Sequence, residues 1–302
     1  MEIKTKVTII GKVCAYHFYR WRYNKRIIMS FLLAFILCFL LTEKVNDFTL
    51  SQGTTLQAFE PFIWVFGDGI SILLIALIGI LLFADMPFLN GAVPYYLIRI
   101  NVGCWVLGQL LYLVLATLIY TGFILVATIF LCGGNAFLGN QWSPTAAILG
   151  YSNYAAQLNI PASLKTFQMS LPYSCLITIF LLVLLYILLS VLFMFYVSIK
   201  KGQVMGVVAC FGFHLFGLLL NPEWISVTLN ISEHAKYIAN IVCGWLSPLR
   251  QATYQKHNFG YDMLPTLGQT YMIYGVIIVI LILLTVRAMK RYHFNFLGTQ
   301  EE

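Results

Sequence analysis

Long apolar stretches separated by short polar segments dominate this chain. The apolar runs are continuous and do not alternate with a period of two, which is typical of membrane-spanning helices and not of barrel strands. A helix needs about 20 mostly apolar residues to cross a bilayer. Membrane spans are predicted at residues 27–42, 62–83, 102–131, 171–199, 204–220 and 271–286.

The composition agrees with this pattern. Apolar side chains make up 60% of the 302 residues and charged side chains only 10%, whereas soluble domains are typically about 25% charged. The mean hydropathy is +0.85. We therefore expect an all-α membrane protein, with residues 1–302 forming a single transmembrane domain and no soluble domain.

The basic residues predict the orientation of the spans. Six spans place both termini on one side, and that side carries thirteen Lys and Arg residues against five on the other. Because cytoplasmic loops are enriched in Lys and Arg, both termini are predicted to be cytoplasmic. The first apolar run begins only near residue 27, so we expect no cleavable signal peptide. Without a soluble basic domain, nucleic-acid binding is not expected.

Residues 4–24 are amphipathic at 100° per residue, which predicts a helix lying in the cytoplasmic interface. Two interpretations remain open: a membrane-surface anchor, or an elbow that meets a cytoplasmic partner. The apolar stripe comprises Val7, Ile10, Cys14, Phe18 and Trp21, and the opposite face comprises Lys12, Tyr16, Tyr19, Tyr23 and Arg26.

The connection at 84–101 is semi-apolar, unlike an ordinary polar hairpin. Pro87 and Pro94 prevent one unbroken helix, and a turn followed by a short helix at 95–99 is expected between the second and third spans. Exposed apolar surface on the cytoplasmic side is typical of a docking surface. The residues that would form it are Pro87, Phe88, Pro94, Tyr95, Tyr96, Leu97 and Arg99.

Two longer segments are predicted on the outer side. Residues 133–170 are nearly neutral. Residues 221–268 contain apolar pieces too short to span, which suggests an outer re-entrant segment of one or two helices that dip into the outer leaflet or pack on it. The seven cysteines show no metal-binding spacing and are expected to be packing residues. The sequence does not show whether Cys132 and Cys243 form a disulfide.

The sequence contains no phosphate-binding loop and none of the common catalytic motifs. Two ionisable residues fall inside predicted spans, where charge is costly. Asp68 is interpreted as an interfacial or helix-capping residue, with a transport-pathway residue as the alternative. His214 is interpreted as a packing residue, with a proton relay as the alternative. A secondary transporter would be expected to show several intramembrane acids and two matching halves.

Taken together, the chain resembles the ABC-2 type permease family, the membrane subunits of ABC exporters of the type V fold. The resemblance rests on the interfacial helix before the first span, the six spans, the segment DMPFLNGAVPYYLIRINVGCW after the second, and the C-terminal region LSPLRQATYQKHNFGYDMLPTLGQTYMIYGVIIVILILLTVRAMKRYHF. The motif Asp85-x-Pro87-Phe88 and residues 95–99 are similar to segments of small permeases of this family in Gram-positive bacteria. The outer loop at 133–170 is larger than in the smallest members of the family.

The resemblance implies a bacterial cytoplasmic-membrane protein that is not itself an enzyme. A second permease chain, identical or homologous, and a separate cytoplasmic ATPase holding ATP and Mg²⁺ would be its partners, with no cofactor on this chain. Residues 87–99 would be the coupling helix, with the 4–24 helix beside it. Spans one, two and five would line the pathway. Near the outer end of the second span, Phe62, Trp64 and Phe66 would gate the pathway or form an interfacial aromatic belt.

The expected function is therefore export or flipping of a hydrophobic or amphipathic substrate, such as a peptide, lipid or drug. The alternatives are a stand-alone secondary transporter or channel, or an intramembrane enzyme. A transporter of that kind would depend on Asp68 or His214 and would need no ATPase. The sequence determines neither the substrate nor whether the dimer is homomeric.

Overall fold

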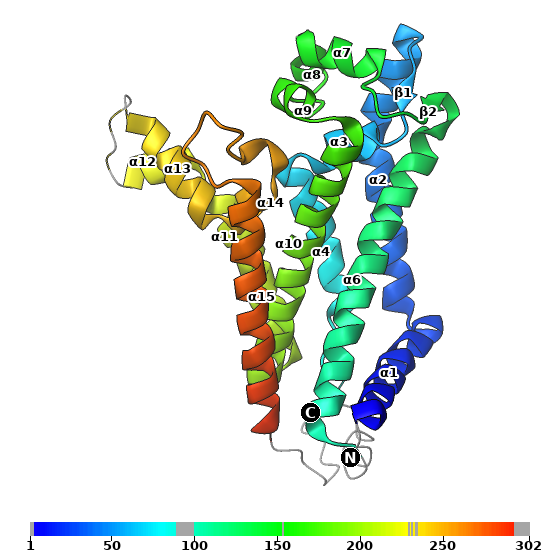
Figure 1. The fold of residues 1–302 in the computed structure, drawn as a ribbon, viewed down its shortest axis with the longest axis vertical. Helices are drawn as coiled ribbons and strands as arrows, with labels where there is room; N and C mark the ends of the chain where they lie inside the picture. Colours follow the sequence, from blue (N-terminus) through cyan, green and yellow to red (C-terminus); the bar gives the residue numbers. More distant parts are fainter. Residues whose placement is uncertain are drawn as a thin grey trace.

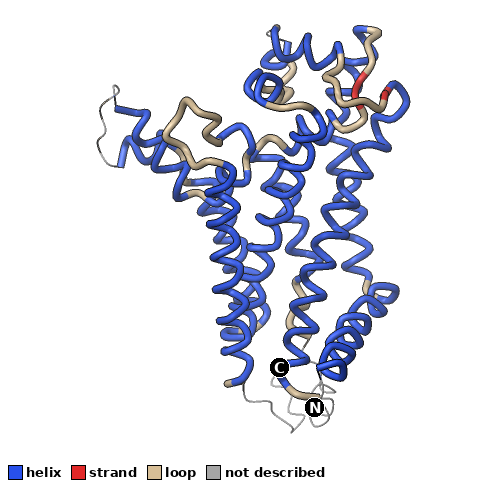
Figure 2. The backbone as a smooth tube through the Cα atoms, in the orientation of Figure 1, coloured by secondary structure: helices blue, strands red, loops and turns tan. Residues whose placement is uncertain are grey.

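The computed structural model describes residues 3–88, 100–152, 154–228, 230, 232 and 235–292. This part of the chain is 81% helical, and its only paired strands are the two-residue β1 (Leu56–Gln57) and β2 (Ala136–Phe137). Figure 2 shows these strands in red, at one end of a helical bundle. This architecture fits an all-α membrane protein.

Four helices are individually long and apolar enough to cross a membrane, and up to six spans result if each of two bent helix pairs counts as one. The four are α2 (Lys25–Gln52), α6 (Val102–Cys132), α10 (Pro172–Lys201) and α15 (Leu267–Lys290). The bent pairs are α3 (Glu60–Phe66) with α4 (Gly69–Phe83), and α11 (Gln203–Leu219) with α12 (Pro222–Thr228).

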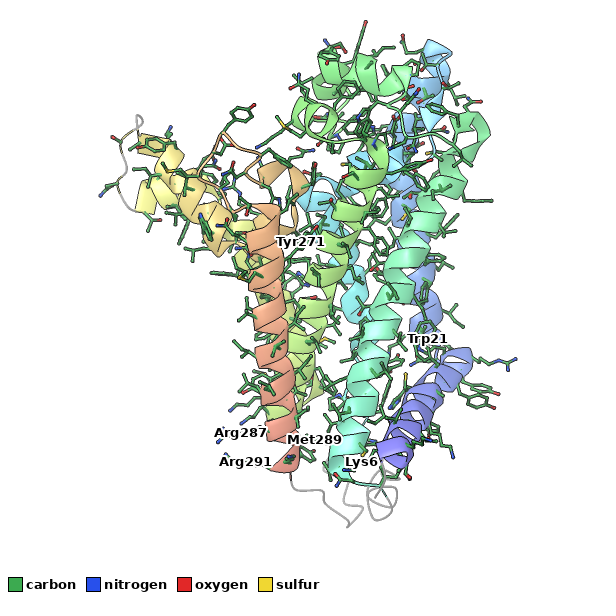
Figure 3. The ribbon with its side chains drawn as sticks, in the orientation of Figure 1. Lys6, Trp21, Tyr271, Arg287, Met289 and Arg291 are labelled. Atoms are coloured by element: carbon green, nitrogen blue, oxygen red, sulfur yellow. The ribbon has the colours of Figure 1, made fainter. Side chains whose placement is uncertain are left out.

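The bundle has two distinct ends (Figure 1). The basal end contains α1 (Ile3–Tyr19), the 3-10 turn Arg20–Tyr23 and the C-terminal end of α15. The apical end contains a cap of short helices: α7 (Pro144–Tyr151), α8 (Tyr154–Gln157) and α9 (Leu164–Met169). Figure 3 shows Lys6, Arg287 and Arg291 together at the basal end.

The helix that carries the first predicted span is longer than expected. The prediction ended at residue 42, but α2 continues to Gln52 through Glu43, Lys44 and Asp47, which are exposed. Beyond residue 42 the helix buries Val45, Phe48 and Thr49, which stand at helical spacing and face the apical cap. Charged residues therefore mark the point where the helix passes beyond the apolar core, and not its end.

The second predicted span, 62–83, is not one straight helix. It breaks between α3 and α4, whose axes differ by 89°. Asp68 is the N-cap of α4, and its carboxylate accepts hydrogen bonds from the backbone N–H groups of Ile70 and Ser71, at 3.0 and 3.3 Å. The Asp68 carboxylate satisfies orphan donors at the new helix start, which explains how the chain turns within an apolar run.

Helix α10 lies at the centre of the core and packs against α6, α11 and α15. The approach of α10 to α11 is close at Gly206, where an added Cβ would lie 1.8 Å from the Ser198 hydroxyl oxygen and 2.9 Å from the Met194 carbonyl oxygen. Small residues allow helices in membranes to approach in this way.

We expect Gly206→Ala to destabilise the fold by about 2 kcal/mol, because the backbones of α10 and α11 must separate to accommodate the methyl group. Gly212→Ala, in the same helix, is the matched control: its Cβ would meet nothing within 4 Å, so alanine should be neutral or slightly stabilising. Thermal unfolding of both purified variants measures the difference. Equal midpoints for the two variants would contradict this close packing.

The segment after α11 forms an apical arm (residues 222–266) of short helices. It contains α12, α13 (Lys236–Leu246), α14 (Pro248–Ala252) and the 3-10 turn Tyr254–Lys256. Helix α12 is bent by 79° from α11, and α12 and α13 project from the side of the bundle in Figure 1. Cys132 and Cys243 are both buried free thiols, so this structure contains no disulfide between them.

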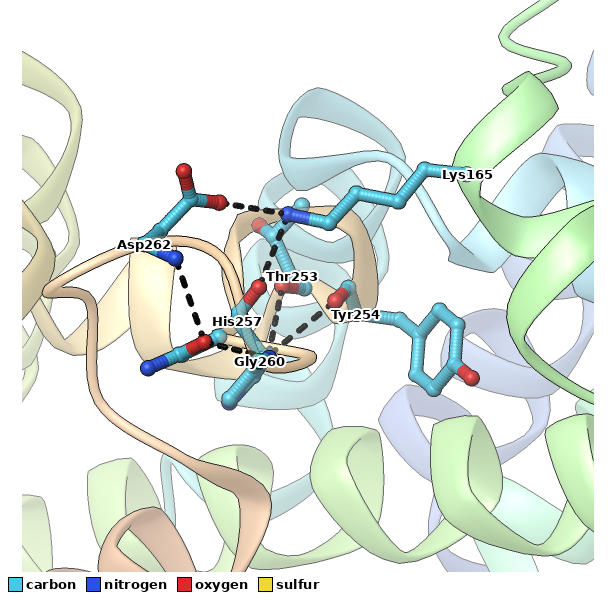
Figure 4. Close-up of polar contacts among 7 residues, drawn as sticks. Lys165, Thr253, Tyr254, His257, Gly260 and Asp262 are labelled. Carbon is cyan, nitrogen blue, oxygen red and sulfur yellow. Dashed lines mark hydrogen bonds and ion pairs between the residues drawn. The ribbon is translucent and has the colours of Figure 1, made fainter.

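Lys165 of the apical cap joins the cap to the apical arm (Figure 4), and the buried His257 of the arm joins the arm to α15. His257 Nδ1 lies 3.1 Å from the carbonyl oxygen of Thr253, and its Nε2 lies 3.1 Å from the Thr270 hydroxyl. Lys165 donates to the His257 carbonyl at 2.9 Å and to the Asp262 carboxylate at 3.1 Å. Burial lowers the pKa of His257, so the neutral ring holds this junction together.

Candidate coupling site

At the basal end, residues 85–88 follow the last turn of α4 and contact four other elements. Met86 and Phe88 are buried, and the Met86–Pro87 peptide bond is cis. We call residues 85–88 the basal junction. It immediately precedes the part of 84–101 that lies outside the described residues.

Asp85 attaches the basal junction to the start of α2. Its carboxylate forms an ion pair with Arg26, and it accepts a hydrogen bond from the Asn24 side-chain amide at 3.2 Å. Asn24 is also the N-cap of α2, because its side-chain oxygen accepts from the Arg26 N–H at 3.1 Å. The same two residues that begin α2 therefore hold the end of α4.

Gln203 attaches the basal junction to α11. Its side-chain amide donates to the carbonyl oxygens of Asp85 and Pro87, both at 3.0 Å. Gln203 is the first residue of α11 and follows the sharp turn at Gly202, whose φ of +93° is a conformation that favours glycine. A displacement of residues 85–87 would thus act directly on the first turn of α11.

Phe88 attaches the basal junction to α1 and α6. Its ring stacks on His17 with centroids 4.8 Å apart and lies 6.3 Å from the ring of Tyr112. The Arg20 guanidinium lies 4.5 Å from the Phe88 centroid, which is within cation–π range. Trp21 donates its indole N–H to the Tyr112 hydroxyl at 3.0 Å, so the rings of both helices form one cluster.

His17 is the polar member of this cluster and is fully buried. Neither ring nitrogen has a hydrogen-bond partner within the described part of the chain. Burial, and secondarily the Arg20 charge, lower the pKa of His17 to about 4. The imidazole is therefore neutral at physiological pH and acts as an aromatic packing group.

We expect acidification from pH 7 to pH 5 to weaken the packing of α1 through His17 by about 2 kcal/mol. Unfolded histidine titrates near 6.5, so the stability that depends on the neutral ring is complete above that pH and is lost as the pH falls toward 4. His17→Phe keeps a ring that does not titrate. Thermal unfolding at both pH values should show a smaller loss for the variant, and equal losses would contradict the assignment.

Helix α1 meets α6 at a small residue. An added Cβ at Gly108 would lie 2.6 Å from the Cβ of Val13, and the buried side chains of α1 are Val13, Cys14 and His17. The predicted apolar stripe is therefore only partly the packed face: Cys14 is buried, whereas Val7 is 61% exposed. The close approach at Gly108 selects which face of α1 packs.

Of the residues predicted to dock a partner, Pro87 and Phe88 lie in the basal junction. Phe88 is covered by α1 and α6, so its side chain supports the segment and does not form a free surface. The others, Pro94, Tyr95, Tyr96, Leu97 and Arg99, lie outside the described residues.

The predicted pathway residues are distributed differently. Phe62, Trp64 and Phe66 are fully buried in α3 and face protein, with Trp64 beside the ring of Trp142 at 5.4 Å. His214 is buried between helices, where Nδ1 lies 2.7 Å from the Tyr186 hydroxyl. With Asp68 serving as a helix cap, the structure does not bring these five residues together in one site.

Sequence reasoning missed His17, Arg20 and Gln203, which make the principal contacts to the basal junction. Each is polar and isolated, and each meets a residue far away in the chain, 118 positions in the case of Gln203 and Asp85. The Gly202-Gln203 pair between two long apolar runs was the one available signal, because it marks a tight turn beside the same end of the bundle.

Comparison with known proteins assigns neither a family nor a function to the chain. No protein-family model, curated protein or solved structure matches the chain.

Proposed function

We propose that the chain is the membrane-embedded permease subunit of an ABC exporter. It would move a hydrophobic or amphipathic substrate across or out of the bacterial cytoplasmic membrane, with both termini cytoplasmic. ATP and Mg²⁺ would be held by a separate ATPase subunit, and a second permease chain would complete the pathway. This chain would carry no cofactor and catalyse no reaction of its own.

The basal junction is the observation that supports this proposal. A subunit driven by a partner needs a point where an external force reaches several helices together. Residues 85–88 are bonded to α2 through Arg26 and Asn24, to α11 through Gln203, and to α1 and α6 through Phe88. An ATPase that engages 89–99 would therefore act on four helices.

The alternative of a stand-alone transporter needs Asp68 or His214 as a transport residue. Asp68 caps α4, and His214 is bonded to Tyr186, so a structural role accounts for both. In transport assays on reconstituted vesicles, Asp68→Asn and His214→Gln should retain transport under the present proposal and lose it under the alternative.

Co-purification tests the proposal directly. The chain, expressed with its neighbouring genes and purified through an affinity tag in mild detergent, should retain a nucleotide-binding subunit whose ATP hydrolysis increases in the complex. Purification of an active transporter that contains no such subunit would overturn the proposal.

A further inference from the structure

An apolar groove lies between α4 and α11 in the basal half of the bundle. Its volume is about 460 Å³. Its lining consists entirely of apolar side chains: Leu77, Ile80 and Leu81 from α4, Ala84 at its C-cap, and Val207, Val208 and Phe211 from α11. Because Val208 is 57% exposed, the groove opens toward the surroundings of the bundle and is not a sealed core cavity.

Polar groups follow the groove in sequence at its basal end. Ala84, the C-cap of α4 and the last lining residue on that side, directly precedes Asp85, and Gln203 at the start of α11 bridges to the Asp85 and Pro87 carbonyls at 3.0 Å. The groove therefore begins near the polar end of the bundle and extends into its apolar middle. An occupant with a polar group at one end and an apolar chain at the other matches this arrangement.

Two cations are close in sequence to the basal end of the groove. Lys200 and Lys201 form the last turn of α10, three and two residues before Gln203, and both are exposed. Neither forms an ion pair with another described residue, since the carboxylates that do pair, Asp85 and Asp262, bind Arg26 and Lys165. Asp85 is thus already neutralised, and the local charge beside the groove is positive.

We propose that this groove binds an anionic phospholipid of the leaflet at the basal end. One acyl chain would lie against Val208 and Phe211, and the phosphate headgroup would contact Lys200 and Lys201. The charge of the lysines and the apolar lining together favour an anionic lipid over a zwitterionic lipid with the same chains. The groove lies between two of the three spans expected to line the pathway, but lipid binding there needs neither the ATPase nor transport, so this proposal does not depend on the proposed function.

The proposal is tested by lipid binding to the purified chain in detergent, without any ATPase. Phosphatidylglycerol and phosphatidylcholine with identical acyl chains are titrated and bound lipid is measured by native mass spectrometry. Wild type should prefer phosphatidylglycerol. Lys200→Gln with Lys201→Gln should weaken phosphatidylglycerol binding about 30-fold, at about 1 kcal/mol per lysine. It should weaken phosphatidylcholine binding much less, because the choline cation already balances the phosphate charge.

Val208→Trp fills the groove and should reduce retention of both lipids. The matched controls are Val126→Trp, at a similarly exposed site on α6, and Lys6→Gln with Lys12→Gln, which removes two exposed basal charges elsewhere. Both controls should behave as wild type. Equal binding of the two lipids by wild type, unchanged binding in Val208→Trp, or the same charge effect in the Lys6 and Lys12 control would overturn the proposal.

A second copy of the chain is the competing occupant of the groove. If it fills the groove, Val208→Trp will shift the oligomeric state measured by light scattering and leave lipid retention unchanged, which also overturns the proposal. Because no measurement here includes an ATPase, the absence of an ATPase partner would leave the lipid result intact, and the two proposals fail separately.

Discussion

Replacing Glu60 with alanine is expected to destabilise the apical cap by about 4 kcal/mol. Glu60 is completely buried at the start of α3. Its carboxylate accepts from the Ser143 N–H at 2.7 Å, the Gln57 N–H at 3.2 Å and the Ser143 hydroxyl. Removal of the carboxylate leaves these buried donors without an acceptor, and each such group costs about 1–3 kcal/mol.

The Glu60 network has consequences beyond one residue because Ser143 also caps a helix. The Ser143 hydroxyl oxygen accepts from the Ala146 N–H at 3.0 Å and thus begins α7, while β1 pairs with β2 directly beside Gln57. Loss of Glu60 should therefore loosen β1, β2 and α7 together. We expect this region to lose protease resistance while the long helices remain folded.

Two further variants make the Glu60 measurement specific. Glu60→Gln keeps one acceptor oxygen of the same reach, so its loss should be about 2 kcal/mol. Glu43→Ala removes an exposed carboxylate from α2 and should change stability by less than about 0.5 kcal/mol. Thermal unfolding of the three variants in detergent ranks their stabilities. A Glu60→Ala midpoint equal to that of Glu43→Ala would contradict a structural role for Glu60.

The sequence predicts a structural feature well when the residues that produce it are neighbours in the chain. Helices α6 and α10 occupy the ranges expected from apolar runs alone, because a continuous run in lipid must satisfy its backbone hydrogen bonds internally. The break at Asp68 was harder to detect, since Phe62–Phe66 and Ile70–Phe83 are equally apolar. Only the Gly67-Asp68-Gly69 sequence indicates that a new helix could begin there.

The basal junction depends instead on contacts between residues far apart in the sequence. Pro87 and Phe88 could be selected from sequence because two prolines interrupt an apolar segment. The partners of the basal junction could not be selected, because His17, Arg26 and Gln203 come from three different helices and meet residues 85–88 only after the bundle has formed. Periodicity reports which face of a helix is apolar, but it does not report which helix packs against that face.

The same distinction applies to the acidic residues. Glu60 and Asp85 lie just outside the two ends of the second predicted span, where a carboxylate needs no special role, yet one organises the apical cap and the other the basal junction. A carboxylate at the end of a span is expected in either case. What distinguishes the two is the partner, a set of backbone N–H groups for Glu60 and a guanidinium for Asp85.

Replacing Phe88 with alanine is expected to abolish most of the ATPase stimulation proposed for this chain, by about tenfold, while membrane insertion is retained. The ring fills the space between His17, Arg20 and Tyr112. Its removal leaves a cavity at a buried site, for which losses of about 3–5 kcal/mol are typical. Residues 85–88 would then no longer be held against α1 and α6.

Three measurements on the Phe88→Ala complex separate coupling from folding. Affinity for the ATPase should fall modestly, stimulated hydrolysis should fall strongly, and protease resistance of α10 and α15 should be unchanged.

Phe88→Tyr preserves the stacked ring and should retain most stimulation. Tyr23→Ala removes an aromatic ring that is 74% exposed at the same end and should behave as wild type. A charged residue at Leu97, outside the described residues, should reduce ATPase affinity itself. Full stimulation in Phe88→Ala would show that force does not pass through the basal junction, because the ring is the contact that joins this segment to both α1 and α6.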